Sequence, residues 1–392
     1  MYGLETRKGI KRVAGLLICT AIIRMLAIPT YAAASSSVAP MTLDCTSAVL
    51  MEASTGTVLY EQNADVVCPP ASITKIMTLL LVMEAIEAGK LRMDDLVTAS
   101  AHAASMGGSQ IYLKEGESMR VEDLIKSVVI SSANDAALAL AEHLCGTEEA
   151  FVALMNEKAG ELGMVNTHFE NTNGLDDTVT NHVTTARDVA IMSRVLIGYR
   201  SILQYSSIWM DTIRDGAFGL TNTNRLIRFY PGATGLKTGS TAKAKFCISA
   251  TAERNGMTLI CVIMGAPTRD IRNEEAKKLL DWGFSGYELY AVPAEDLAPL
   301  PVLGGVRNSC AVQRDGFCCV LPKGSASSLE AVPELPAQLH APVETGQVIG
   351  CVSYRYGGEI LGKADIIAKE TVEKIEFGGL FARMLCYFIG KY

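Results

Sequence analysis

The sequence predicts an α+β fold in which helices pack on both sides of an antiparallel sheet over residues 41–286. Residues 47–61, SAVLMEASTGTVLYE, place two apolar stretches around a Ser-Thr-Gly turn, which is typical of a β-hairpin. Residues 245–265 predict a second hairpin, because KFCISATAE and MTLICVIMG flank an Arg-Asn-Gly turn. Helical patterns fill the region between the hairpins, so strands at both ends enclose inserted helices.

The first inserted helix is expected to be buried. Residues 73–89, ITKIMTLLLVMEAIEAG, are apolar on nearly every face and stop at Gly89, which is typical of a glycine C-cap. VEDLIKSVVI (121–130) and AALALAEHLCG (136–146) are further helical stretches, separated by the polar residues SSAND. NEEAKKLLDWGF (273–284) predicts an amphipathic helix after the second hairpin.

The composition is that of a globular protein. Of the 392 residues, 49% are hydrophobic and 20% are charged, and the length favours two domains. The net charge is −7, and no basic cluster with interleaved aromatic residues occurs, so no nucleic-acid partner is expected. The five histidines are scattered and no Cys-x-x-Cys pair occurs, so neither a metal site nor another cofactor is expected.

Residues 1–34 have the order of a secretory signal peptide. Basic residues at positions 7–12 precede the apolar run VAGLLICTAII (13–23), and small residues follow from Ala32. The apolar run is too short to span a bilayer, and cleavage after Ala32 or Ala34 would fit. We therefore expect an exported protein, with a short amphipathic anchor as the alternative. Its cysteines are expected to be mostly reduced, although disulfides remain open.

Beyond residue 286 the sequence becomes rich in proline and in short strand patterns, such as CAVQRDGFCCVL (310–321) and GQVIGCVSYRYGGEIL (346–361). Residues 287–370 therefore predict a small all-β C-terminal domain. Residues 371–392 predict an amphipathic C-terminal helix that can lie on a membrane surface, with Glu376 and Arg383 opposite its apolar face. Docking of that face on the protein's own domain is the alternative. The apolar face is made by Phe377, Leu380, Phe381, Met384 and Phe388.

Ser72 lies three residues before Lys75, at the start of the buried helix. Positions i and i+3 share one face of a helix, so the hydroxyl and the amine can touch. A serine needs a base to become a nucleophile, but a lysine with a pKa near 10.4 is neutral in only about one molecule in 2,500 at pH 7. Burial and a second cation must therefore lower the pKa of Lys75. A solvated lysine at a helix start is the alternative, and the pattern recurs at residues 240–243, STAK.

Two later motifs favour the catalytic interpretation. Ser132-Ala133-Asn134 lies in the polar break between two helices, and Lys237-Thr238-Gly239 precedes the strand KFCISATAE. Taken singly, the first could be a helix cap and the second a turn into a strand. In this order, however, Ser-x-x-Lys, Ser-x-Asn and Lys-Thr-Gly resemble the motif set of the penicillin-recognising serine enzymes.

The finer resemblance is to low-molecular-mass penicillin-binding proteins that act as serine-type D-alanyl-D-alanine carboxypeptidases. It covers about residues 41–285, which contain PASITKIMT, GGSQIYLKEGE, SSANDAALALAEH, HFENTNGLDD, HVTTARDVA and GLKTGSTAKAKFCISATAERNGMTLICVIMGAPTRDIR. It implies a β-lactamase/transpeptidase-like domain, pentapeptide stems of peptidoglycan ending in D-Ala-D-Ala as substrate, and β-lactams as covalent inhibitors. It also implies a location at the outer face of the bacterial cytoplasmic membrane.

The resemblance assigns catalytic roles to three residues. Ser72 would be the acylated nucleophile, Lys75 its base, and Ser132 a proton relay to the departing D-alanine nitrogen. Asn134 would hold both Lys75 and the peptide amide of the substrate. Lys237 would supply the second cation that lowers the pKa of Lys75.

The same resemblance assigns the binding roles. Lys237 and Thr238 would bind the terminal carboxylate, and Gly239 would leave room for an extended peptide at the strand edge. The backbone N–H groups of Ser72 and Ser240 would form the oxyanion hole.

Departures from the family pattern leave the substrate preference open. Ser240 stands where some relatives have histidine, and Thr223 stands where some have arginine. No Glu-x-x-x-Asn block typical of class A β-lactamases is evident, so fast hydrolysis of penicillin is not expected. The alternatives are a D,D-endopeptidase, a weak β-lactamase or a non-catalytic cell-wall scaffold. His182, Arg187 and Asp188 are expected to be structural.

Overall fold

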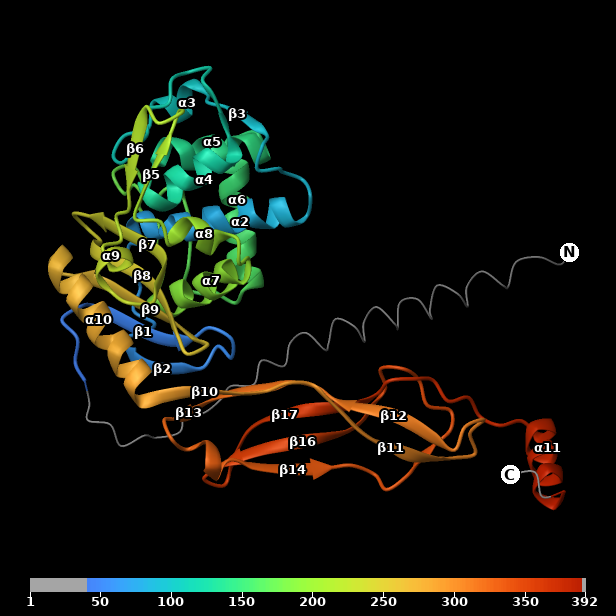
Figure 1. Cartoon of the computed structure of the whole chain (residues 1–392). Helices are drawn as coiled ribbons and strands as arrows, with labels where there is room; N and C mark the ends of the chain where they lie inside the picture. Colours follow the sequence, from blue (N-terminus) through green and yellow to red (C-terminus); the bar gives the residue numbers. More distant parts are fainter. Residues whose placement is uncertain (1–40, 390–392) are drawn as a thin grey trace, which may run out of the picture. The chain divides into compact units, whose positions relative to one another are not determined.

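The computed structural model describes residues 41–389 (Figure 1). Its first part is built on a five-stranded antiparallel sheet with the order β2-β1-β9-β8-β7. Both predicted hairpins are present, because β1 pairs with β2 and β8 with β9. β7 pairs with β8 alone, so its other edge is open among the described strands. The strands are β1 (Ser47–Glu52), β2 (Val58–Gln62), β7 (Ala233–Thr241), β8 (Lys245–Arg254) and β9 (Met257–Ala266).

Helices cover both faces of this sheet. Side chains alternate along β1, so Val49 and Met51 join the core that contains most of the helices, whereas Ala48 and Leu50 join the core under α10. The predicted α+β class, with helices on both sides of the sheet, is confirmed. The long helices are α2 (Lys75–Glu87), α4 (Val121–Ile130), α5 (Asn134–Cys145), α6 (Glu148–Glu161), α7 (Ala186–Gly198) and α10 (Arg269–Gly286).

Shorter elements connect the long helices, and the sequence patterns do not predict them. Two small antiparallel strand pairs are among them: β3 pairs with β4 across a connection that contains α3, and the β5–β6 hairpin leads into the segment that holds Thr223. The short elements are α3 (Ala101–Ala104), α8 (Ile202–Ser206), α9 (Leu226–Phe229), β3 (Leu96–Thr98), β4 (Ser118–Arg120), β5 (Met210–Ile213) and β6 (Phe218–Thr221).

α2 is the buried central helix that the sequence predicts. Every residue from Lys75 to Met83 is buried, and Gly89 follows the helix with a φ of 68°. Ser72 lies outside the α-helix itself, in a 3₁₀ turn (η1, Ala71–Thr74). Residues i and i+3 are eclipsed in a 3₁₀ turn, so this turn places Ser72 and Lys75 on one face.

Residues beyond α10 form two sheets with their own core, so the predicted all-β C-terminal domain is confirmed. Six strands have the order β14-β16-β17-β12-β11-β15, and β10 pairs separately with β13. Val312, Tyr354 and Ile366 are buried in the core of this domain. The elements are β10 (Tyr287–Val292), β11 (Glu295–Leu303), β12 (Ser309–Arg314), β13 (Phe317–Pro322), β14 (Glu330–Glu334), β15 (Leu339–His340), β16 (Val348–Tyr356), β17 (Glu359–Ala368) and a 3₁₀ turn, η2 (Ala326–Ser328).

The chain continues into α11 (Phe377–Phe388), the predicted C-terminal helix, none of whose residues is buried. Within residues 41–389, no helix combines the length and the apolar character needed to cross a membrane. The predicted signal peptide, residues 1–34, lies outside the described residues.

Candidate active site

Ser72 and Lys75 are in direct contact. Lys75 Nζ donates to Ser72 Oγ at 2.8 Å and to the carbonyl oxygen of Asn173 at 2.8 Å. Lys75 is fully buried in the first turn of α2, whereas Ser72 is half-buried in the preceding 3₁₀ turn. Ser72, the predicted nucleophile, is therefore accessible to a ligand, whereas Lys75, its predicted base, is shielded from solvent.

The environment of Lys75 favours the neutral amine. Burial lowers the pKa of Lys75 well below its ordinary value, and the nearby charge of Lys237 lowers it further. The buried carboxylate of Asp135 acts in the opposite direction, but with a smaller effect. Among residues 41–389, no carboxylate forms an ion pair with Lys75. A neutral lysine that contacts a hydroxyl can accept its proton.

Ser132 and Lys237 form a second serine–lysine pair. Lys237 Nζ donates to Ser132 Oγ at 2.8 Å and to its neighbour's carbonyl, Thr238 O, at 2.8 Å. Ser132 has a φ of 62°, a left-handed conformation that is uncommon for residues other than glycine and that recurs at active sites. Lys237 is buried, and burial together with the charge of Arg272 lowers its pKa to about 7.

Arg272 is a component of this site that the sequence analysis missed. Its guanidinium donates to the carbonyl oxygen of Cys247 in β8 and, through Nε and Nη2, to Asn273 Oδ1.

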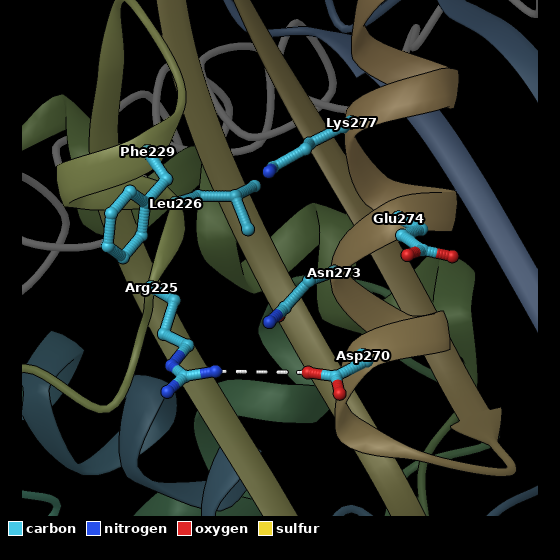
Figure 2. Close-up of a pocket in the computed structure, with 7 residues that line it drawn as sticks. All are labelled: Arg225, Leu226, Phe229, Asp270, Asn273, Glu274 and Lys277. Atoms are coloured by element: carbon cyan, nitrogen blue, oxygen red, sulfur yellow. Dashed lines mark ion pairs between the residues drawn. The ribbon is translucent and has the colours of Figure 1, made fainter.

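Asn273 also lines a pocket of about 180 Å³ between α9 and α10, into which Figure 2 shows its side chain pointing. An Arg225–Asp270 ion pair of 3.8 Å borders this pocket (Figure 2). None of the predicted site residues lines it.

Asn134 begins α5 but does not hold Lys75, so that part of the prediction is wrong. Its Nδ2 donates to the carbonyl oxygen of Gly107 at 2.7 Å, and the acceptor that Lys75 uses is Asn173 O. The buried Oδ1 of Asn134 has no hydrogen-bond partner among the described residues. Leaving a buried acceptor unpaired is costly, so this oxygen is available to an N–H group of a ligand.

Gly239 has a different structural reason from the predicted one. A Cβ built on Gly239 would lie 2.9 Å from Ser72 N, 3.0 Å from Ile73 N and 3.0 Å from Pro70 O. Glycine here lets β7 approach the backbone that carries the nucleophile, so the space it provides is filled by the protein itself. Thr238, next to it, donates to Thr223 Oγ1 at 2.7 Å.

Ser240 is exposed near the end of β7, and its N–H role in the oxyanion hole stays a prediction. The second Ser-x-x-Lys pattern, which starts at Ser240, does not form a second pair of the Ser72–Lys75 kind. Its lysine, Lys243, instead donates to the carbonyl oxygen of Asp176 at 2.7 Å. Among the described residues, no His, Cys, Asp and Glu side chains cluster in a way that could hold a metal ion.

A loop that we call the bridging loop, residues 173–176, was missed as a site component. Its first residue supplies the carbonyl that binds Lys75 Nζ. Its second, Gly174, has a φ of 86°, and a Cβ there would lie 1.8 Å from Ala71 O. The only signal in the sequence is the short segment NTNG, because the functional atom is a backbone carbonyl.

His182 supports the same region, in line with its expected structural role. Glu170 N donates to His182 Nδ1 at 2.9 Å, so the other ring nitrogen carries the proton toward Thr74 Oγ1 at 2.7 Å. Thr74 in turn donates to Ala71 O. Burial lowers the pKa of His182 to about 4, so the ring is neutral at neutral pH.

The fold and the two contacts between a serine and a buried lysine define an enzyme that transfers acyl groups through an active-site serine. Residues 33–268 match the family model of the S11 peptidases, described as D-alanyl-D-alanine carboxypeptidase. The chain therefore belongs to the S11 family of D-alanyl-D-alanine carboxypeptidases, which are serine peptidases. Residues 296–374 match the model of the penicillin-binding protein 5 C-terminal domain. The family and enzyme class predicted from the motifs are confirmed.

Curated relatives agree with this assignment. The chain is 42% identical to the D-alanyl-D-alanine carboxypeptidase DacF of Bacillus subtilis, over 84% of this chain and 86% of the relative. It is 34% identical to DacC of Escherichia coli, a carboxypeptidase of the same name, over 96% of each chain.

Solved structures match as well. Penicillin-binding protein 5 of Haemophilus influenzae has a TM-score of 0.77 and 33% identity, covering 86% of this chain and all of that one. Penicillin-binding protein D2 of Listeria monocytogenes, solved in its ampicillin-bound form, has a TM-score of 0.58 and 34% identity. The match covers 62% of this chain and 99% of that one.

Proposed function

We propose that the protein removes the terminal D-alanine from peptidoglycan pentapeptide stems through an acyl-enzyme on Ser72, and that β-lactams acylate the same serine. The observation that carries this proposal is the presence of two serine–lysine pairs, Ser72–Lys75 and Ser132–Lys237, with an N···O distance of 2.8 Å in each. The two lysines lie close enough for the charge of Lys237 to lower the pKa of Lys75. In the first pair, Lys75 can activate Ser72 as the nucleophile. In the second pair, Ser132 contributes a hydroxyl that Lys237 contacts.

The acylation step follows from these contacts. Neutral Lys75 takes the proton of Ser72 Oγ, and the oxygen attacks the carbonyl carbon of the penultimate D-alanine. The N–H groups of Ser72 and Ser240 stabilise the resulting oxyanion. The proton that Lys75 took returns through Ser132, acting as a relay, to the nitrogen of the departing D-alanine, and the C–N bond breaks. Water later hydrolyses the ester, which frees Ser72.

Binding of the chain end explains why the enzyme would act as a carboxypeptidase. Among residues 41–389, no acidic side chain forms an ion pair with the buried cation Lys237, so a substrate carboxylate can become its counterion. The hydroxyls of Thr238 and Thr223 lie 2.7 Å apart, and both can form hydrogen bonds with the same carboxylate. The free Oδ1 of Asn134 can accept the substrate's peptide N–H.

The decisive measurement is the release of D-alanine from a pentapeptide ending in D-Ala-D-Ala, with the Ser72→Ala variant as control. Release by the wild type that vanishes in the variant is the expected result. No release by a protein that still forms a penicillin adduct would redirect the assignment to cross-linked substrates, and hydrolysis of the adduct would indicate a β-lactamase. Absence of an adduct would favour a scaffold.

We further propose that the protein is exported and that α11 lies on the outer face of the bacterial cytoplasmic membrane. The apolar side chains of α11 are exposed, with Phe377 at 83% and Phe388 at 82%, and this exposure argues against docking on the protein's own domain. On the opposite side, Arg383 donates to Asn308 Oδ1 and to Val306 O. A helix held by its polar side can place its apolar side in a membrane interface.

Vesicle sedimentation tests the membrane proposal. The wild type should sediment with phosphatidylglycerol vesicles, whereas a Phe381→Asp, Phe388→Asp double variant should stay in the supernatant. A Leu96→Asp, Val165→Asp double variant, which changes two exposed apolar residues outside α11, is the matched control. N-terminal sequencing of the mature protein tests export, and cleavage after Ala32 or Ala34 is expected. Equal sedimentation of the wild type and the Phe381→Asp, Phe388→Asp variant would refute the role of α11.

A further inference from the structure

This inference rests on the proposed function and concerns the part of the stem upstream of D-Ala-D-Ala. If Lys237 and Thr238 hold the terminal carboxylate while Ser72 attacks the next carbonyl, the rest of the stem runs along the open edge of β7. A strand advances about 3.3 Å per residue, so the third residue from the chain end lies two to three positions beyond Thr238. That position is the end of β7, at Thr241.

The bridging loop reaches the end of β7 at this position. On one side, Leu175 Cδ2 lies 3.5 Å from where Gly108 would carry a Cβ, and the amide of Asn134 lies 2.9 Å from the same point. On the other side, the carboxylate of Asp176 accepts a hydrogen bond from Thr241 Oγ1. Leu175 and Asp176 therefore connect the region of Asn134 with the end of β7, and a stem that runs along this strand edge reaches them.

Two opposite charges meet at the β7 end of the bridging loop. Asp176 carries its carboxylate there, and Lys243 places its ammonium 2.7 Å from the carbonyl oxygen of the same residue. The two side chains do not pair with each other, and within the described part of the chain neither forms an ion pair with any other residue. Lys243 is exposed and Asp176 is half-buried, so both charges are accessible to a ligand.

We propose that Asp176 and Lys243 together recognise the side chain of the third stem residue and select a side chain that ends in both an ammonium and a carboxylate. Asp176 binds the ammonium, and Lys243 binds the carboxylate. A diaminopimelate residue carries both groups on the last carbon of a flexible methylene stem. A lysine residue carries only the ammonium, so Lys243 finds no partner in it. The substrate class is thus a diaminopimelate stem.

The test compares kcat/KM for D-alanine release from three pentapeptides that differ only at the third residue: meso-diaminopimelate, its amide at the distal carboxylate, and L-lysine. The wild type should prefer the diaminopimelate peptide about fivefold over the other two, the effect of one exposed charge pair. Lys243→Met should remove this preference. Lys243→Glu should reverse it, and Asp176→Asn should weaken release from all three.

The matched control is Lys90→Met. Lys90 is an exposed lysine just beyond the far end of α2, and its replacement removes the same charge from the surface. It should leave the preference unchanged. A wild type that does not distinguish the three peptides, or a Lys243→Met variant that retains the preference, would overturn the inference and leave the carboxypeptidase intact. No release from any peptide would overturn the proposed function and this inference with it.

Discussion

Lys75 Nζ lies 2.8 Å from Ser72 Oγ, although Lys75 is fully buried and no carboxylate among the described residues pairs with it. Burial of an unpaired ammonium is unfavourable, so Lys75 lowers the stability of the folded protein at the position where a base is needed. A buried lysine that contacts a hydroxyl but has no carboxylate partner is expected to serve catalysis and not stability. Measurements of activity and of stability on the same variant can separate these two roles.

Lys75→Met is expected to abolish acylation while leaving the protein at least as stable as the wild type. Methionine fills the same space without a charge to bury, but it cannot take the proton of Ser72. The rate of acylation by a fluorescent penicillin should fall about 10³-fold or more. Thermal unfolding provides the second measurement, and a marked fall in Tm would show that the lysine stabilises the fold.

Lys237 makes the stability depend on pH. Its pKa is about 7 in the folded protein and 10.5 when exposed, so between these values the unfolded chain binds more protons. This contribution to stability is fully present above pH 10.5 and is lost as the pH falls toward 7. Relative to Lys237→Met, the wild type should gain up to about 1.4 kcal/mol per pH unit. Urea unfolding of both proteins at pH 7.5 and 9 measures this difference, and a constant difference would contradict the shifted pKa.

His182 gives a pH dependence at the acid end. Its pKa is lowered from 6.5 to about 4, so its contribution to stability is present above pH 6.5 and is lost as the pH falls to about 4. The loss amounts to about 3 kcal/mol. His182→Gln, which cannot titrate, should reduce this loss when unfolding is measured at pH 6.5 and 4.5. Equal acid sensitivity of the two proteins would indicate that other groups cause it.

Gly239→Ala is expected to damage the site through the backbone. The added methyl would press on Ser72 N and Ile73 N at about 3 Å, so β7 or the 3₁₀ turn must shift. A displacement of this kind near the nucleophile should lower acylation about 10²-fold. Gly219→Ala in β6 is the control, because a Cβ there meets nothing within 4 Å. Equal activity of the two variants would show that the turn is free to adjust.

The sequence predicted the parts of the fold and site that depend on side-chain type. Hairpin turns, the apolar run of α2 and the three short motifs each leave a local pattern. The strands of β3 to β6 have only three or four residues, too few for alternation to be recognised. The family blocks covered the bridging loop, but no side chain marks the Asn173 carbonyl as the partner of Lys75.

Other contacts could not be predicted because one residue type can adopt several side-chain orientations and can have neighbours that are distant in the sequence. An asparagine amide can turn either way, and Asn134 uses its nitrogen for Gly107, which the motif cannot reveal. Gly239 was interpreted as space for a substrate, but its neighbours, Ser72 and Ile73, are distant in the sequence. Arg272 lies well beyond the Lys-Thr-Gly motif and becomes a neighbour of Lys237 only when α10 packs on β8.

The bridging loop joins two tasks that evolution would otherwise adjust separately. Asn173 and Gly174 are fixed by Lys75 and Ala71, so a change at these positions alters reactivity toward every substrate. Asp176 forms hydrogen bonds with Thr241 at the end of β7 and with Lys243 beyond it. Adaptation to a different cell-wall chemistry is therefore expected to begin at Lys243, whose replacement should change the preference for the third stem residue, while the first half of the loop stays unchanged.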